Sequence, residues 1–130
     1  MSNILGKENK IEILVRKELF SIGYRFRKND NRYPGSPDIF LPKYRTAIFV
    51  HGCFWHGHKN CKKSNLPKTN FHFWKTKINS NIQRDKRIKR ELTNMGIFVI
   101  IIWSCELQST QKRFKRFEQL IEEINQSRIG

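Results

Sequence analysis

Three cysteines and one histidine have the spacing of a metal-binding set. Cys53, His58 and Cys61 follow the pattern Cys-x4-His-x2-Cys, and Cys105 comes after an apolar run further along the chain. Three thiolates and one imidazole complete the tetrahedral coordination that structural zinc prefers. An odd number of cysteines without a secretory signal argues against disulfides. We therefore predict a Zn²⁺ site, with His56 as a rival fourth ligand if Cys105 points elsewhere.

A carboxylate and two further histidines could carry out phosphate chemistry. Asp38 follows a proline at the start of an apolar segment, and it approaches His51 and His56 if residues 38–41 and 46–51 pair as a hairpin. A carboxylate suits Mg²⁺, and imidazoles can act as general base and general acid near neutral pH. Hydrolysis of a phosphodiester needs this combination of groups.

Two other carboxylates are candidates for the same site. Glu12 lies on the first predicted helix and could reach the metal through water, although a glutamate beside Lys and Arg is commonly part of a surface ion pair. Asp85 stands between Arg84 and Lys86. It could pair with these neighbours or orient a catalytic imidazole.

The charge of the chain favours a nucleic acid as partner. Its 130 residues include 26 Lys and Arg against 11 Asp and Glu, a formal net charge of +15. Eleven of these basic residues lie between positions 59 and 90, where Phe71, Phe73 and Trp74 are interspersed. Basic side chains release counterions from phosphates, and aromatic rings stack on bases or wedge between them.

Hydrophobic periodicity predicts an α/β fold with a mixed central sheet flanked by helices. Apolar spacing indicates a helix over about 8–22, a long or broken helix from Trp74 that ends at Gly96, and a closing helix that is capped by Ser109 or Thr110. Strands are expected near 24–27 and at 38–41, 46–51 and 97–103, the last as a buried central strand. Residues 52–69 should form a loop. The order is αβββαβα.

Length and composition predict one domain over residues 1–130, because 38% apolar residues suffice for a compact core. No apolar run is long enough to span a bilayer, and the segment MSNILGKENK lacks the apolar stretch of a signal peptide. We therefore expect a cytoplasmic protein without a membrane partner.

Several blocks of sequence between about residues 3 and 107 resemble the very-short-patch DNA mismatch repair endonuclease family, Vsr. The blocks are VHGCFWHGH at 50–58, PGSPD at 34–38, Phe73-Trp74, Asn81, Arg84-Asp85 and Trp103-Ser104-Cys105-Glu106. The resemblance implies a restriction-endonuclease-like fold of the PD-(D/E)xK type. It also implies a monomeric enzyme that nicks one strand of double-stranded DNA 5′ of the thymine in a T·G mismatch. It further implies a bacterial protein associated with the nucleoid, with other mismatch repair proteins as possible partners.

The resemblance also implies roles for individual residues. Asp38 would bind Mg²⁺ together with the backbone carbonyl of Val50, and Glu12 would lie near the metal. His51, supported by Asp85, and His56 would transfer protons at the scissile phosphate. The zinc ligands would be Cys53, His58, Cys61 and Cys105, in agreement with the ligand count above. Phe54, Trp55 and Trp74 would push into the duplex beside the mismatch, whereas their alternative role is core packing.

Two alternatives remain at this point. One is a restriction-type or other repair nuclease that acts on a different lesion, and the other is a zinc-containing nucleic-acid-binding module without catalysis. The family also has a longer N-terminal segment than this chain, so either the chain is shortened or it holds DNA less extensively.

Overall fold

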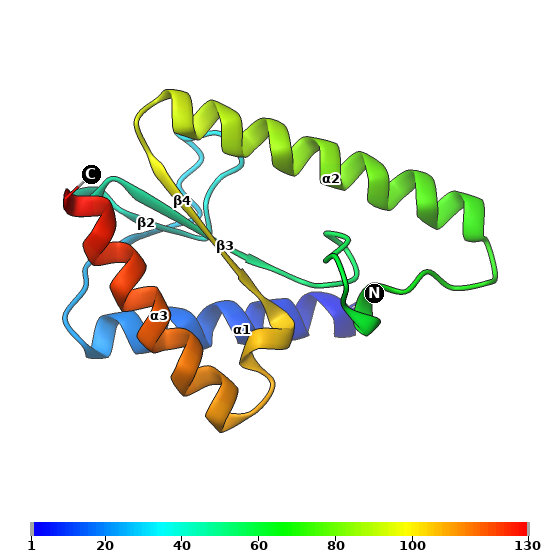
Figure 1. The fold of residues 1–130 in the computed structure, drawn as a ribbon, viewed down its shortest axis with the longest axis horizontal. Helices are drawn as coiled ribbons and strands as arrows, with labels where there is room; N and C mark the ends of the chain where they lie inside the picture. The colour runs from blue at the N-terminus through cyan, green and yellow to red at the C-terminus, as the bar shows by residue number, and fades with distance from the viewer. Residues whose placement is uncertain (1, 130) are drawn as a thin grey trace.

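A four-stranded mixed β-sheet forms the middle layer of the structure, a computed structural model that describes residues 2–129 and the side chains of residues 10–126 (Figure 1). The elements are α1 (Ser2–Ser21), β1 (Arg27–Lys28), β2 (Ile39–Leu41), β3 (Thr46–His51), α2 (Phe71–Asn94), β4 (Phe98–Trp103) and α3 (Thr110–Ile129). Short 3-10 helices span Pro42–Tyr44, Lys62–Ser64 and Ser104–Leu107. The strand order is β1-β2-β3-β4, with β3 and β4 parallel and the other pairs antiparallel.

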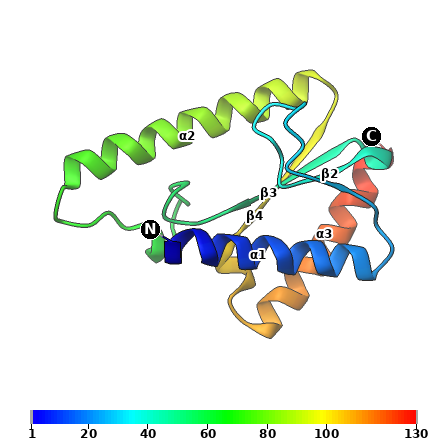
Figure 2. The same ribbon diagram turned by 180° about the vertical axis from the view of Figure 1, so that it is seen from behind.

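Helices cover both faces of the sheet, because successive side chains of a strand point to opposite sides. Ile48 and Val50 of β3 join a core cluster with residues of α1 and α3, whereas Ala47 and Phe49 join a second cluster with Leu92 of α2. Figures 1 and 2 accordingly show α2 on one side of the sheet and α1 and α3 on the other. The order of elements and the mixed sheet agree with the prediction from sequence.

The position of β4 within the sheet differs from the prediction. We expected a buried central strand over 97–103, but β4 is an edge strand among the described residues and pairs with β3 alone. The inner strands are β2 and β3, and all of their residues are buried. In β4 only Ile100 and Ile102 are buried and Phe98 is 42% exposed, so its apolar run indicates neither full burial nor the number of neighbouring strands.

Two helix boundaries also differ from the prediction. The second helix begins at Phe71 rather than Trp74 and continues unbroken to Asn94, after Asn70 in a left-handed conformation with φ of 57°. The first helix begins at Ser2 rather than near residue 8. Helix ends carry weak sequence signals when no side chain caps the first turn, and Asn70 makes no such cap. The predicted cap at Ser109 is confirmed, since its Oγ accepts a hydrogen bond from the backbone N–H of Lys112 at 3.1 Å.

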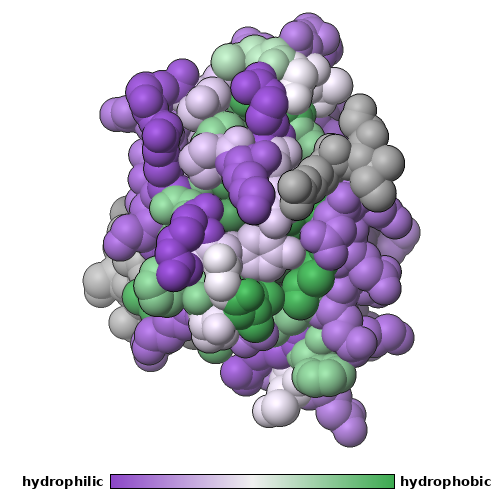
Figure 3. Space-filling view, turned by 90° about the vertical axis from the view of Figure 1, so that its left-hand side faces the viewer, coloured by the Kyte–Doolittle hydropathy of each residue, from purple (hydrophilic) through white to green (hydrophobic). Residues whose placement is uncertain are grey.

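The surface is dominated by polar side chains. Figure 3 shows hydrophilic residues over most of one face, with a small group of hydrophobic residues among them. Within residues 2–129, none of the helices combines the length and the apolar character that crossing a bilayer requires.

Candidate active site and metal centre

Asp38 is fixed at the junction where β2 begins. Its Oδ2 accepts a hydrogen bond from the backbone N–H of Val50 at 2.7 Å. Its backbone carbonyl accepts hydrogen bonds from Nη2 of Arg16 at 3.0 Å and from the backbone N–H of Asn29 at 3.4 Å. Because β2 and β3 are antiparallel, the start of β2 and the end of β3 meet at the same end of the sheet. The strand pairing therefore positions Asp38 beside the last residues of β3, as predicted.

Glu12 of α1 brings a second carboxylate to this point. Its carboxyl group lies in hydrogen-bonding contact with that of Asp38. Burial raises the pKa of Asp38, an effect that the hydrogen bonds from Val50 and Glu12 and the charges of Arg16 and His56 offset only in part. Two half-buried carboxylates in contact repel each other unless a proton or a cation lies between them. The oxygen donors suit a hard divalent cation such as Mg²⁺.

The two imidazoles of the site stack on each other. His51 is the last residue of β3, His56 lies in the following loop, and their ring centroids are 3.7 Å apart with an interplanar angle of 5°. Nδ1 of His56 lies 2.7 Å from Oδ2 of Asp85 on α2. We expected Asp85 to support His51; its hydrogen bond is instead with His56, and it acts on His51 through its charge. Nδ1 of His51 is buried and has no hydrogen-bond partner among the described residues.

The surroundings of the site shift the pKa of His51 and that of Asp85. Burial, followed by the charges of His56 and Arg84, lowers the pKa of His51 from its usual 6.5 to about 4, against a raising effect of Asp85. Burial would raise the pKa of Asp85, but the hydrogen bond with His56 and the charges of the two histidines and Arg84 lower it overall. Asp85 is therefore ionised where it meets Nδ1 of His56. Neighbouring groups whose environments differ in this way are suited to act as base and acid.

We predict that the protein becomes less stable as the pH falls, because of His51. Between pH 6.5 and about 4 the unfolded chain binds a proton at this position that the folded chain excludes. The free energy of unfolding should therefore decrease as the pH falls through this window, by at most about 3 kcal/mol. His51→Gln should lose this dependence, while His72→Gln, at an exposed histidine, should keep it. Urea unfolding at a series of pH values tests the prediction, and parallel curves for His51→Gln and the unmodified protein would contradict it.

One face of α2 holds the loop that carries His56. Nδ2 of Asn81 donates a hydrogen bond to the backbone carbonyl of Trp55 at 2.9 Å. Gly57 has φ of 58°, and a Cβ at this position would lie 2.6 Å from Ile82 Cδ1 and 2.9 Å from Ile78 Cγ2. Only glycine allows this close approach without a shift. These contacts and the Asp85 hydrogen bond recur at positions 78, 81, 82 and 85, the spacing of a single helical face. Asn81 was noted in the sequence, but the contacts between α2 and the loop were not predicted. The helical spacing of these four positions could have indicated them.

Three predicted DNA-contacting aromatics lie together. Phe54 and Trp55 of the loop have ring centroids 5.5 Å apart, and Trp74 of α2 lies 5.4 Å from Phe54 and 5.6 Å from Trp55. Phe73, which is 61% exposed, packs against Trp74 at 5.1 Å. The rings form a surface group next to the imidazoles rather than part of either buried core cluster.

The predicted zinc ligands also converge. The ligand atoms of Cys53, His58, Cys61 and Cys105 all lie within 4.8 Å of one another. Nδ1 of His58 is 3.5 Å from Sγ of both Cys53 and Cys105. A tetrahedral zinc ion with its usual bond lengths would hold sulfur and nitrogen roughly 3.5 Å apart. The donor set therefore has the spacing of a metal centre, and it groups Cys105, not His56, with the other three residues.

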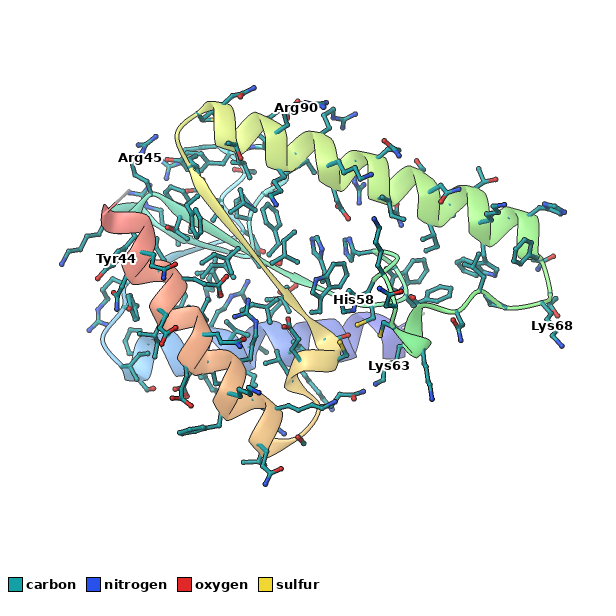
Figure 4. All side chains as sticks on the ribbon, viewed as in Figure 1. Tyr44, Arg45, His58, Lys63, Lys68 and Arg90 are labelled. Carbon is teal, nitrogen blue, oxygen red and sulfur yellow. The ribbon has the colours of Figure 1, made fainter. Side chains whose placement is uncertain are left out.

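The metal centre would tie the loop to the end of β4. Figure 4 shows His58 where the loop meets this end of the strand, and the His58 ring stacks on that of Trp103 at 4.0 Å. Burial and the neighbouring thiols Cys53 and Cys61 raise the pKa of Cys105 to about 12. A divalent cation would reverse this effect, because it binds thiolates.

Comparison with known proteins gives consistent results. Residues 1–63 match the family model described as DNA mismatch endonuclease Vsr. The chain is 49% identical over 124 residues to the type II nicking enzyme V.NmeAIP of Neisseria meningitidis, and the aligned region covers 95% of this chain and 88% of that protein. It is 45% identical over 107 residues to V.XorIIP of Xanthomonas oryzae pv. oryzae, another type II nicking enzyme (82% of this chain, 78% of that protein). It is 38% identical over 112 residues to DNA mismatch endonuclease Vsr of Escherichia coli (86% and 71%).

Proposed function

We propose that this chain, which belongs to the Vsr family of DNA mismatch endonucleases, nicks one strand of duplex DNA 5′ of the thymine in a T·G mismatch and uses Mg²⁺ to do so. That the chain is a DNA-nicking endonuclease follows from the family. The mismatch, the ions and the roles of the residues below are the proposal. The observation that carries it is the convergence of Asp38 and the stacked imidazoles at one end of the sheet, beside a group of aromatic rings.

The residues present account for phosphodiester hydrolysis. The carboxylate of Asp38 and the carbonyl of Val50 would hold Mg²⁺, which when bound supplies charge stabilisation at the phosphate. Neutral His51 accepts a proton from the attacking water. His56, held by Asp85, donates a proton to the leaving 3′ oxygen. The bond between phosphorus and that oxygen breaks, which leaves 5′-phosphate and 3′-hydroxyl ends.

The aromatic group offers a means of selecting a mismatch. Phe54, Trp55 and Trp74 present adjoining rings beside the imidazoles. Inserting apolar rings between base pairs costs unstacking energy, and this cost is lower at a T·G wobble pair than at a Watson–Crick pair. The wedge thereby tests how easily the duplex deforms. The Cys₃His centre, which we assign to structural Zn²⁺, would fix the loop that carries two of these rings.

The proposal predicts a strong preference for mismatched DNA. An end-labelled duplex with one T·G pair should be nicked at least about a hundredfold faster than its T·A counterpart when Mg²⁺ is present. EDTA should abolish cleavage of both. Equal rates on the two duplexes would contradict the mismatch assignment and favour the restriction-type or other repair nuclease considered above.

A further inference from the structure

Arg16 contacts both acidic residues of the proposed metal site. Its Nη2 lies 3.5 Å from Oε2 of Glu12, 3.0 Å from the backbone carbonyl of Asp38 and 3.4 Å from Oδ1 of Asn29. The side chain of Arg16 is only 15% exposed. Its positive charge also acts on the carboxyl group of Asp38. The guanidinium therefore lies within the carboxylate pair's immediate surroundings, where solvent screens it little.

The charges of this group are too nearly balanced to capture a divalent cation firmly. When both carboxyl groups are ionised, as binding a cation requires, Glu12 and Asp38 contribute two negative charges and Arg16 one positive charge, so these three side chains carry a net charge of −1. Mg²⁺ gives up its hydration water reluctantly and usually binds through one or two carboxylates together with substrate phosphates. A cation next to Arg16 is also repelled by it. The anionic phosphate of DNA would supply the missing negative charge.

We propose that Arg16 makes binding of the catalytic cation dependent on bound DNA. This inference rests on the proposed function, since it assumes that Asp38 helps to hold the ion and that Glu12 lies beside it. With Arg16 in place, the site binds a divalent cation weakly until a phosphate enters. By linkage, the cation and the DNA each strengthen the binding of the other. Arg16 is thus a positioning residue that restricts the assembly of the active centre to the DNA-bound enzyme.

Two substitutions test the charge balance independently. Arg16→Gln removes the positive charge, whereas Asn29→Asp adds a negative charge with the same shape next to Nη2 of Arg16. Asn29 has φ of 47°, a conformation that aspartate also tolerates. Each change makes the net charge −2, so each should tighten cation binding in the absence of DNA by about tenfold. A loss of structure at Arg16 would have the opposite effect, since a disordered site binds the ion less well.

The measurement is Mn²⁺ binding to the zinc-loaded full chain without DNA, followed by the electron paramagnetic resonance signal of free Mn²⁺. Lys17→Gln is the matched control, because it removes one positive charge from the exposed neighbouring position on α1. Lys17→Gln and Arg16→Lys should bind Mn²⁺ as the unmodified protein does. Asp38→Asn should abolish the binding that Arg16→Gln and Asn29→Asp strengthen.

A second measurement uses the unmodified protein alone. Its affinity for Mn²⁺ should rise at least about tenfold when a T·G duplex with a non-cleavable phosphorothioate linkage is bound. In Asn29→Asp the affinities for Mn²⁺ with and without bound duplex should differ less. The inference is overturned if Asn29→Asp binds Mn²⁺ no more tightly than the unmodified protein does. The same result for a folded Arg16→Gln variant also overturns it. These results leave the proposed function intact if the unmodified protein still nicks T·G duplex. Failure of that reaction would instead overturn the proposed function.

Discussion

Replacing Asp38 by asparagine should lower the rate of nicking by at least about a thousandfold while affinity for uncut duplex stays within about twofold of that of the unmodified protein. The carboxylate lies at the junction of β2 and β3, in contact with Glu12 and next to the stacked imidazoles. Asparagine keeps an oxygen that can accept the hydrogen bond from the N–H of Val50, so the strand junction remains satisfied. It cannot supply the negative charge that a divalent cation needs.

Asparagine is a sharper choice than alanine here, because alanine would leave the Val50 N–H buried without a partner and could destabilise the strand junction. Single-turnover nicking of a T·G duplex with Mg²⁺ and a binding measurement in EDTA separate chemistry from affinity. Glu91→Gln, at an exposed carboxylate on α2, is the control and should nick normally. A nicking rate for Asp38→Asn within tenfold of the unmodified rate would remove Asp38 from the metal site.

Local patterns sufficed to predict the parts of the site that lie on strands. The apolar character of residues 46–51 predicts β3 with its observed bounds. The hairpin interpretation then brings Asp38 beside His51, because antiparallel neighbours share a sheet end. The Cys₃His set was also predictable, since few residue types bind zinc and their number matches its coordination.

Contacts between distant elements could not be derived in this way. Whether Asp85 faces His51 or His56 depends on how far the loop after β3 is drawn toward α2, and that depends on the packing of Gly57 against Ile78 and Ile82. The edge position of β4 depends on the number of strands, which its own apolar run does not encode. The role of Arg16 is likewise invisible in sequence, because an arginine four residues after a glutamate is an ordinary helical ion pair.

The metal centre and the active site are connected through the same short loop. Cys53 begins the loop and His58 ends its first turn, so that Phe54, Trp55 and His56 lie between two metal ligands. Fixing both ends at one ion restricts the conformations available to the residues between them. Loss of the ion should therefore disturb the aromatic group and His56 before it disturbs the two core clusters of the sheet.

Replacing Cys105 by serine should abolish tight zinc binding and lower the free energy of unfolding by roughly 3–5 kcal/mol. This is a fraction of the roughly 10–16 kcal/mol by which zinc stabilises isolated zinc-finger peptides, because the sheet retains its own core. Serine is nearly the same size as cysteine but supplies no thiolate, and Cys105 lies at the end of β4, where the ion would anchor the loop. Zinc content by atomic emission and thermal melting with and without added Zn²⁺ measure the two effects.

Gln108→Ser is the matched control, since it introduces serine three residues further on at an exposed position. This variant should retain one zinc per chain and melt like the unmodified protein. Prolonged chelation of the unmodified protein should lower its melting temperature to that of Cys105→Ser. Added Zn²⁺ should then restore the melting temperature of the chelated protein but not that of Cys105→Ser. One firmly held zinc in Cys105→Ser would show that another residue completes the site. His56 is then the ligand to examine, and because an imidazole that binds zinc through Nε2 while Nδ1 stays paired with Asp85 has no proton left to donate to the leaving oxygen, the proposed acid would have to be reassigned.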